Sequence, residues 1–145
     1  MADEHEHEHR EQRLFTLDEA NELVPELTRL IERVQRQYRT LLGALADKGM
    51  GPDDLEAALQ APENQAMQAC LDDITECIAQ IEAYGCHFKG LDLGLVDFPS
   101  MIGNQVAYLC WQYGEDHVGF WHSLEDGFRG RQAIAPDHPT KRTLN

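Results

Sequence analysis

The sequence has few basic residues. Lysine and arginine together number 12 against 26 aspartates and glutamates, which gives a formal net charge of −14 over 145 residues. A protein that binds duplex nucleic acid needs a basic patch to replace the counterions on phosphate, and anionic membrane surfaces repel an acidic chain. The composition therefore argues against nucleic acid and against a membrane surface as partners.

Long apolar runs are also missing. No stretch approaches the roughly 18 apolar residues that a membrane-spanning helix requires. The first residues are acidic, unlike a secretory signal peptide. Hydrophobic residues still make up 42% of the chain, which is enough for a folded core. We therefore expect a soluble, cytoplasmic protein.

Cysteine pairs and catalytic motifs are absent from the sequence. None of the four cysteines, Cys70, Cys77, Cys86 and Cys110, forms a CxxC pair, so a disulfide framework is not expected. There is no GxSxG, no SxxK and no Walker phosphate loop. No catalytic residue is predicted, and catalysis is the least supported class of function.

Residues 16–84 predict two long helices that form an antiparallel hairpin. Thr16 and Glu19 have the spacing of a capping box, and apolar residues then recur at steps of three and four. Pro25 is expected to kink or divide this first helix. A second stretch with the same apolar spacing ends near Gly85, a typical helix terminator.

After the hairpin the pattern changes to the period of two that is typical of strands. Residues 86–89 predict a short strand, and the glycines and the proline of 90–99 predict a loop. Residues 105–113 and 117–122 are rich in valine, tyrosine, tryptophan and phenylalanine, which strands favour. Gly114 suits a type II′ turn between them, so these segments predict a β-hairpin.

The turn at Gly114 sets the expected register of that hairpin. It pairs Trp111 with Val118, and it places Cys110 and His122 on opposite faces of the sheet. Two strands alone rarely hold in water, so the sheet is expected to lie on the helices or on a second subunit.

These elements predict a single α+β domain over residues 14–134. It consists of a long helical hairpin at 16–84 and a small antiparallel β-sheet in 86–134. Residues 1–13 and 135–145 are expected to be flexible tails. The apolar stripe of the hairpin exceeds what so small a sheet covers, which favours a homodimer.

The N-terminal segment alternates histidine with glutamate at His5, His7 and His9. Imidazole and carboxylate groups at this density can capture divalent zinc, nickel or copper. The alternative is a solvated, disordered acidic tail, or an engineered tag. Binding a metal would order the tail at a cost of roughly 1–2 kcal/mol per residue, so the tail would bind metal weakly. The solvated, disordered tail is therefore the favoured interpretation.

A second candidate metal site combines Cys110, His122 and Glu125, whose side chains are competent zinc ligands. The alternative interpretation makes His122 a half-buried hydrogen-bonding residue and Cys110 a small core residue, and it is favoured. Cys86 and His87 are adjacent on a predicted strand, so they point to opposite faces and one metal ion could not easily use both.

Asp97 lies inside the apolar run of residues 95–99. A buried aspartate needs a partner, which Arg129 or Arg131 could supply. The functional alternative makes Asp97 a ligand or a base, and the salt-bridge or loop-capping role is favoured over it.

Several short motifs occur in a fixed order: FTLDEAN at 15–21 before PEL at 25–27, GLVDFP at 94–99, YLCW at 108–111, GE at 114–115, WH at 121–122, and GF with GR within 127–131. Together they resemble a bacterial family, the domain of unknown function 2203, over about residues 14–134. The resemblance implies a small cytosolic protein without established activity. Some members carry a label suggesting heavy-metal cation transport.

Within these motifs the resemblance points to five polar residues, Asp97, Cys110, Glu115, His122 and Arg131. We take Asp97, Glu115 and Arg131 as candidates for binding an unknown cofactor. Neither the histidine-rich tail nor the Cys86-His87 pair belongs to the family pattern.

Two functions are therefore predicted. The first is a non-enzymatic, self-associating interaction or scaffold protein that forms a homodimer and binds a protein partner. The second is a divalent-metal protein of the zinc type, with a site near Cys110, His122 and Glu125 and the histidine-rich tail as a collector.

Overall fold

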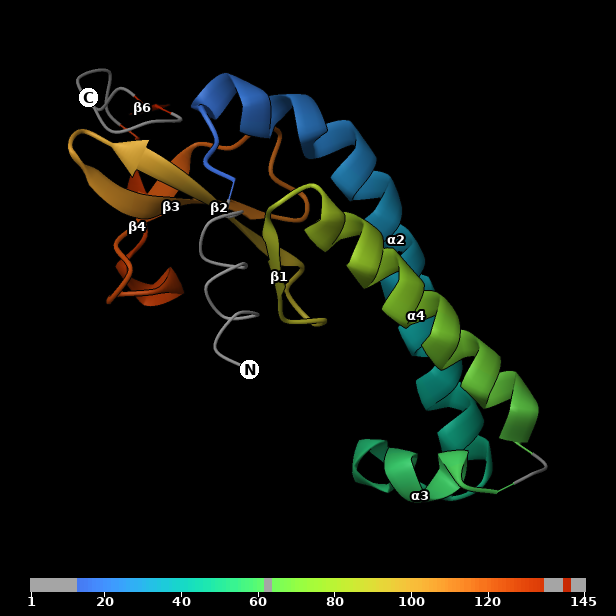
Figure 1. Cartoon of the computed structure of the whole chain (residues 1–145). Coiled ribbons are helices and arrows are strands. Elements are labelled where there is room, and N and C mark those ends of the chain that lie inside the picture. The colour runs from blue at the N-terminus through green and yellow to red at the C-terminus, as the bar shows by residue number, and fades with distance from the viewer. Residues whose placement is uncertain (1–12, 62–63, 135–139, 142–145) are drawn as a thin grey trace, which may run out of the picture.

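The structure is a computed structural model that describes residues 13–61, 64–134 and 140–141 (Figure 1). The helices are α2 (Leu17–Asp47), α3 (Leu55–Leu59) and α4 (Gln65–Ala83). The strands are β1 (His87–Lys89), β2 (Leu95–Ile102), β3 (Gln105–Gln112), β4 (Phe120–His122), β5 (Gln132–Ala133) and β6 (Thr140–Lys141). Short 3₁₀ turns occupy Pro52–Asp54 and Phe128–Gly130. The predicted α+β class, a long helical hairpin followed by an antiparallel sheet, is confirmed.

Helix α2 begins with the capping box that the sequence predicts. The Glu19 amide donates to Thr16 Oγ1 at 3.2 Å, and the Thr16 amide donates to Glu19 Oε1 at 2.9 Å. These two bonds satisfy backbone donors that a helix start leaves free. The helix is continuous from Leu17 to Asp47, so Pro25 does not divide it.

Helices α2 and α4 pack side by side along the hairpin (Figure 1). Arg33 of α2 donates two hydrogen bonds to the Asp73 carboxylate of α4, at 2.7 and 2.6 Å. Leu30 and Ile74 lie in the core cluster at 1% and 4% exposure. The end of the hairpin that carries α3 extends away from the sheet, as Figure 1 shows.

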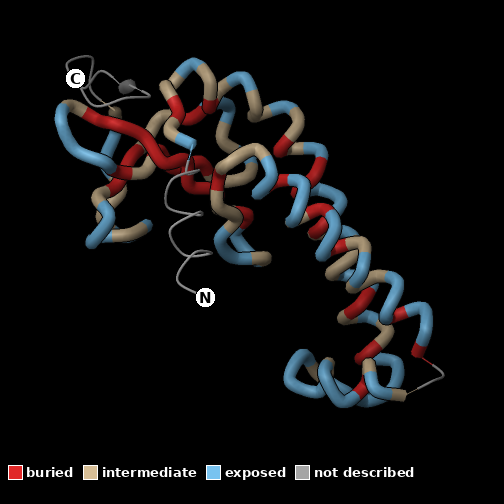
Figure 2. Tube along the Cα trace, viewed as in Figure 1, coloured by how far each residue is buried: buried red, intermediate tan, exposed pale blue. Residues whose placement is uncertain are grey.

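Strand β2 lies where the sequence analysis expected a loop. The sheet has the order β1-β2-β3-β4-β5, with β6 also on β2, so β2 is central. Figure 2 shows this strand as a buried run. Pro99 is tolerated because β1 pairs with β2 only as far as Asp97, and β6 pairs only from Met101 onward. The Pro99 carbonyl instead accepts the Phe15 amide at 2.7 Å.

The predicted register between β3 and β4 is wrong by one residue. Tyr108 pairs with His122 and Leu109 pairs with Trp121. A long-range contact accompanies this shift: the Val118 amide donates to the Asn21 side-chain oxygen of α2 at 2.7 Å, and β4 begins only at Phe120. A shift of one residue moves every side chain of a strand to the other face.

The two faces of the sheet differ in chemistry. Val96, Phe98, Leu109 and Trp111 alternate on the face that belongs to the same core cluster as α2 and α4. The opposite face carries the intervening residues, including Asp97 and Cys110.

Among the described residues, no helix combines the length and the apolar character needed to cross a membrane.

Candidate functional site

Three potential metal ligands meet on the face of the sheet opposite the helices. Asp97 comes from β2, Cys110 from β3 and His122 from β4, and their ligand atoms all lie within 4.8 Å of one another. The residues are 5%, 0% and 3% exposed, respectively. The register explains the cluster, because Asp97 pairs with Cys110 and His122 pairs with Tyr108, two residues before Cys110. Cys110 and His122 therefore share a face, which corrects the sequence-based expectation.

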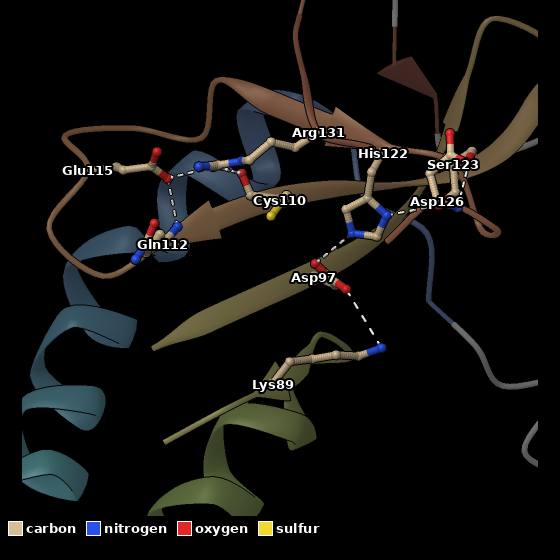
Figure 3. A network of polar contacts seen from close by, with 9 residues as sticks. All are labelled: Lys89, Asp97, Cys110, Gln112, Glu115, His122, Ser123, Asp126 and Arg131. Carbon is tan, nitrogen blue, oxygen red and sulfur yellow. Dashed lines mark hydrogen bonds and ion pairs between the residues drawn. The ribbon is translucent and has the colours of Figure 1, made fainter. Parts of the chain in front are cut away.

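Both ring nitrogens of His122 contact oxygen atoms. Nδ1 lies 2.8 Å from the Ser123 carbonyl oxygen, and Nε2 lies 3.1 Å from Asp97 Oδ1 (Figure 3). A carbonyl oxygen only accepts, so Nδ1 carries a proton and donates it to Ser123. A neutral imidazole then has a lone pair on Nε2, directed at the Asp97 carboxylate. Two acceptors at this distance need a cation between them, either a proton or a metal ion.

The thiol of Cys110 is not set up as a nucleophile. Burial is the main cause that raises the pKa of Cys110 to about 12, and the neighbouring charge of Asp97 raises it further. A reactive cysteine needs the opposite shift. In a catalytic triad of thiol, imidazole and carboxylate, the imidazole lies between the other two groups. Here Nδ1 of His122 contacts Ser123 and Nε2 contacts Asp97, so neither ring nitrogen activates the thiol.

Asp97 has partners that the sequence analysis did not identify. Lys89 Nζ lies 3.7 Å from Asp97 Oδ2, and His122 contacts Oδ1. The sequence analysis expects Arg129 or Arg131 in this role. Lys89 belongs to the short edge strand β1, and its ammonium group lies 5.6 Å from the centre of the Tyr108 ring. The carboxylate is thus shared between a half-exposed cation and a buried imidazole.

Arg131 is bound to Glu115 instead. Its Nη2 donates to Glu115 Oε1 at 2.9 Å and to the Cys110 carbonyl oxygen at 3.4 Å (Figure 3). The guanidinium lies 4.0 Å from the Phe120 ring centre, and Glu115 also accepts the Gln112 amide at 2.7 Å. These contacts close the loop between β3 and β4 and hold it against Arg131, the residue just before β5. The geometry assigns Glu115 and Arg131 a structural contact with each other.

Replacing Arg131 by methionine is expected to lower the free energy of unfolding by about 2 kcal/mol. The change removes a hydrogen bond between charged groups and a contact with an aromatic ring, which leaves Glu115 without its cation. Urea unfolding measures the loss. The control is Arg129→Met, since Arg129 is exposed and takes no part in the contacts of Arg131 described above. Equal stability of the two variants would contradict the assignment.

The structure does not bring the other predicted ligands to the cluster. Glu125 is exposed in the turn after β4 and is not among the three clustered ligands. His5, His7 and His9 lie outside the described residues, as does most of the segment 135–145. Within the described ranges, the third potential ligand beside Cys110 and His122 is therefore Asp97, and not Glu125 as the sequence predicts.

The comparison with protein families identifies the chain. A family model described as an uncharacterized conserved protein, DUF2203, matches residues 13–134. The chain belongs to this family. No curated protein and no solved structure matches it.

The DUF2203 match spans every residue of the cluster. Sequence reasoning named Asp97, Cys110 and His122 separately, and the structure brings them together. Sequence reasoning missed Lys89 and the Ser123 carbonyl. A lysine on an edge strand and a backbone oxygen have no pattern in sequence that would mark them. An accurate strand register would have placed Lys89 two residues from the position opposite Asp97.

Proposed function

We propose that the protein binds one divalent metal ion of the zinc type through Asp97, Cys110 and His122. Carboxylate, thiolate and imidazole are the ligands that zinc takes in proteins. Ligand atoms around tetrahedral zinc lie about 3.3–3.8 Å apart, given bond lengths of about 2.0–2.3 Å. The three groups lie within 4.8 Å of one another, so a contraction of about 1 Å is sufficient.

The observation that carries this proposal is the orientation of His122. Metal-binding histidines commonly donate their second N–H to a backbone carbonyl, which fixes the tautomer and aims the other nitrogen at the metal. The contact between Nδ1 and the Ser123 oxygen has this form, and Nε2 is directed into the cluster. An ionised thiolate and carboxylate would balance the charge of a divalent ion. A thiolate ligand also favours zinc over magnesium or calcium.

The test uses the full-length chain with His5, His7 and His9 replaced by glutamine, so that the tail does not contribute ligands. This parent is incubated with zinc and desalted, and its metal content is measured by elemental mass spectrometry. We expect about one zinc ion per chain. Cys110→Ala is expected to lose it, because the thiolate ligand is gone.

Cys86→Ala is the matched control. Cys86 is a second buried thiol, and burial raises its pKa to about 12 as well, but it donates to the Ile81 carbonyl oxygen and lies outside the cluster. This variant is expected to keep its zinc. His122→Gln gives a second test if Cys110→Ala does not fold. A parent without zinc, or zinc in all of these variants, would refute the site.

Self-association stays a second proposal. Leu30 and Ile74, whose replacement by glutamate would probe a helical dimer interface, are buried within the single chain. Such variants would unfold the hairpin whether or not a dimer exists. Light scattering of the unaltered protein measures its mass directly. The end of the hairpin that carries α3 extends away from the sheet, and we propose it as the contact region of a homodimer or of a complex with a protein partner (Figure 1).

A further inference from the structure

His87 lies beside the cluster on the edge strand β1. It pairs with Asp97 in the antiparallel ladder, and Asp97 pairs with Cys110 on its other side. Residues directly opposite each other across antiparallel strands share a face. His87, Asp97 and Cys110 therefore form one row across three neighbouring strands, on the face that also carries His122.

The ring of His87 has an unused nitrogen. Its Nε2 is buried and has no hydrogen-bond partner, although the residue as a whole is partly exposed. The ring meets Tyr108 edge-on at a centroid distance of 6.0 Å, and Tyr108 in turn contacts the ring of His122 at 5.4 Å. A buried polar atom without a partner costs stability, so such an atom calls for an explanation such as a water or an ion.

We propose that His87 is the fourth ligand of the metal site, an inference that rests on the proposed function. The Cβ atoms of directly opposed residues lie about 4.5–5.5 Å apart, and an imidazole is long enough to bridge that separation. His87 is not among the residues whose ligand atoms lie within 4.8 Å of one another. Its ring therefore turns from Tyr108 toward Asp97 when the metal binds, and the Lys89 ammonium leaves the carboxylate.

Four protein ligands define the kind of site. One side chain then comes from each of β1, β2, β3 and β4, which are consecutive neighbours in the sheet. Zinc sites with four protein ligands are structural, whereas catalytic sites keep a position for water or substrate. The ion in this protein thus ties the three-residue edge strand β1 to the rest of the sheet, and it carries no reacting water.

Cobalt(II) alone is the probe that tests this coordination. The full-length parent with glutamine at positions 5, 7 and 9 is titrated with Co²⁺, and its visible absorption is recorded. Four-coordinate cobalt gives strong d–d bands, and a bound thiolate adds a charge-transfer band. In His87→Ala, water molecules replace the imidazole and raise the coordination number to five or six, which weakens the d–d bands. We expect weakened d–d bands, a retained thiolate band and affinity lower by at least about tenfold.

His117→Ala is the matched control, because His117 is exposed in the loop before β4 and its loss should leave spectrum and affinity unchanged. His87→Phe keeps a ring against Tyr108 and guards against simple loss of packing. It is expected to behave like His87→Ala. If both His87 variants keep the parent spectrum and affinity, the fourth-ligand assignment fails and the three-ligand site stands. If the parent shows no thiolate band, the proposed metal function fails with it.

Discussion

Zinc at about 100 times its dissociation constant is expected to raise the free energy of unfolding by about 2.7 kcal/mol. The ion binds the folded chain, where Asp97, Cys110 and His122 are held together by three strands, and not the unfolded chain, where they are far apart. For a chain of this size the increase corresponds to a midpoint shift of about 5–10 °C. Calorimetry of the parent with glutamine at positions 5, 7 and 9, with zinc and with chelator, measures it.

Three controls test whether zinc bound at the cluster causes this increase in stability. Cys110→Ala should lose the shift, while Cys86→Ala should keep it, since its thiol donates to a backbone carbonyl of α4. Magnesium should produce no shift, because imidazole and thiolate suit it poorly. An equal shift in the parent and in Cys110→Ala would place the stabilising zinc somewhere other than the cluster.

The helical part of the fold could be predicted from sequence because its signals are local. The capping box needs only Thr16 and Glu19, and the apolar stripes need only regular spacing. Helix α2 begins directly after Thr16, as the capping box predicts, and α4 ends two residues before Gly85. The start that the sequence predicts for the second helix, around Asp53, is wrong, because that segment forms a 3₁₀ turn and the short helix α3 before α4 begins at Gln65. The predicted division of α2 at Pro25 is wrong. Pro25 lies in the third turn of a long helix whose buried side chains pack against α4 and the sheet, and packing of this kind outweighs one lost hydrogen bond.

Strand β2 could not be predicted from its own residues. It is buried along most of its length, so it lacks the alternation of polar and apolar residues that marks a half-exposed strand. Pro99 argued for a loop. The proline is tolerated only because of where β1 ends and β6 begins, and that arrangement involves residues far apart in the sequence.

The candidate site depends on the same long-range information. The sequence identifies the residue types, but the turn at Gly114 predicts opposite faces for Cys110 and His122. Their meeting depends on a single residue of register, which the Asn21–Val118 hydrogen bond helps to set. A turn motif read in isolation cannot reveal a contact with a helix about a hundred residues earlier.

The pair formed by Asp97 and His122 is expected to add little net stability to the metal-free protein. In the presence of a chelator, His122→Leu should lower the free energy of unfolding by about 3 kcal/mol. The reason is that the Asp97 carboxylate, in a residue that is only 5% exposed, loses its buried partner. Asp97→Leu should also destabilise, since His122 Nε2 then lacks its contact. The double variant Asp97→Leu/His122→Leu should return to within about 1 kcal/mol of the unaltered chain, because apolar side chains can replace a buried ion pair without loss.

Urea unfolding of the four proteins gives this double-mutant cycle. The matched cycle on Glu26 and Arg29, an exposed pair at 2.8 Å on one helix, should give a much weaker coupling, because water screens exposed charges. The opposite outcome is a double variant whose free energy of unfolding falls by the sum of the two single losses. The polar groups would then stabilise the fold themselves, and no bound ligand would be needed to explain the cluster. Recovery in the double variant would mean that the polar groups are dispensable for folding. Their burial in the sheet then has its explanation in what they bind. The same double variant is stable but lacks two of the proposed ligands, so it should take up no zinc.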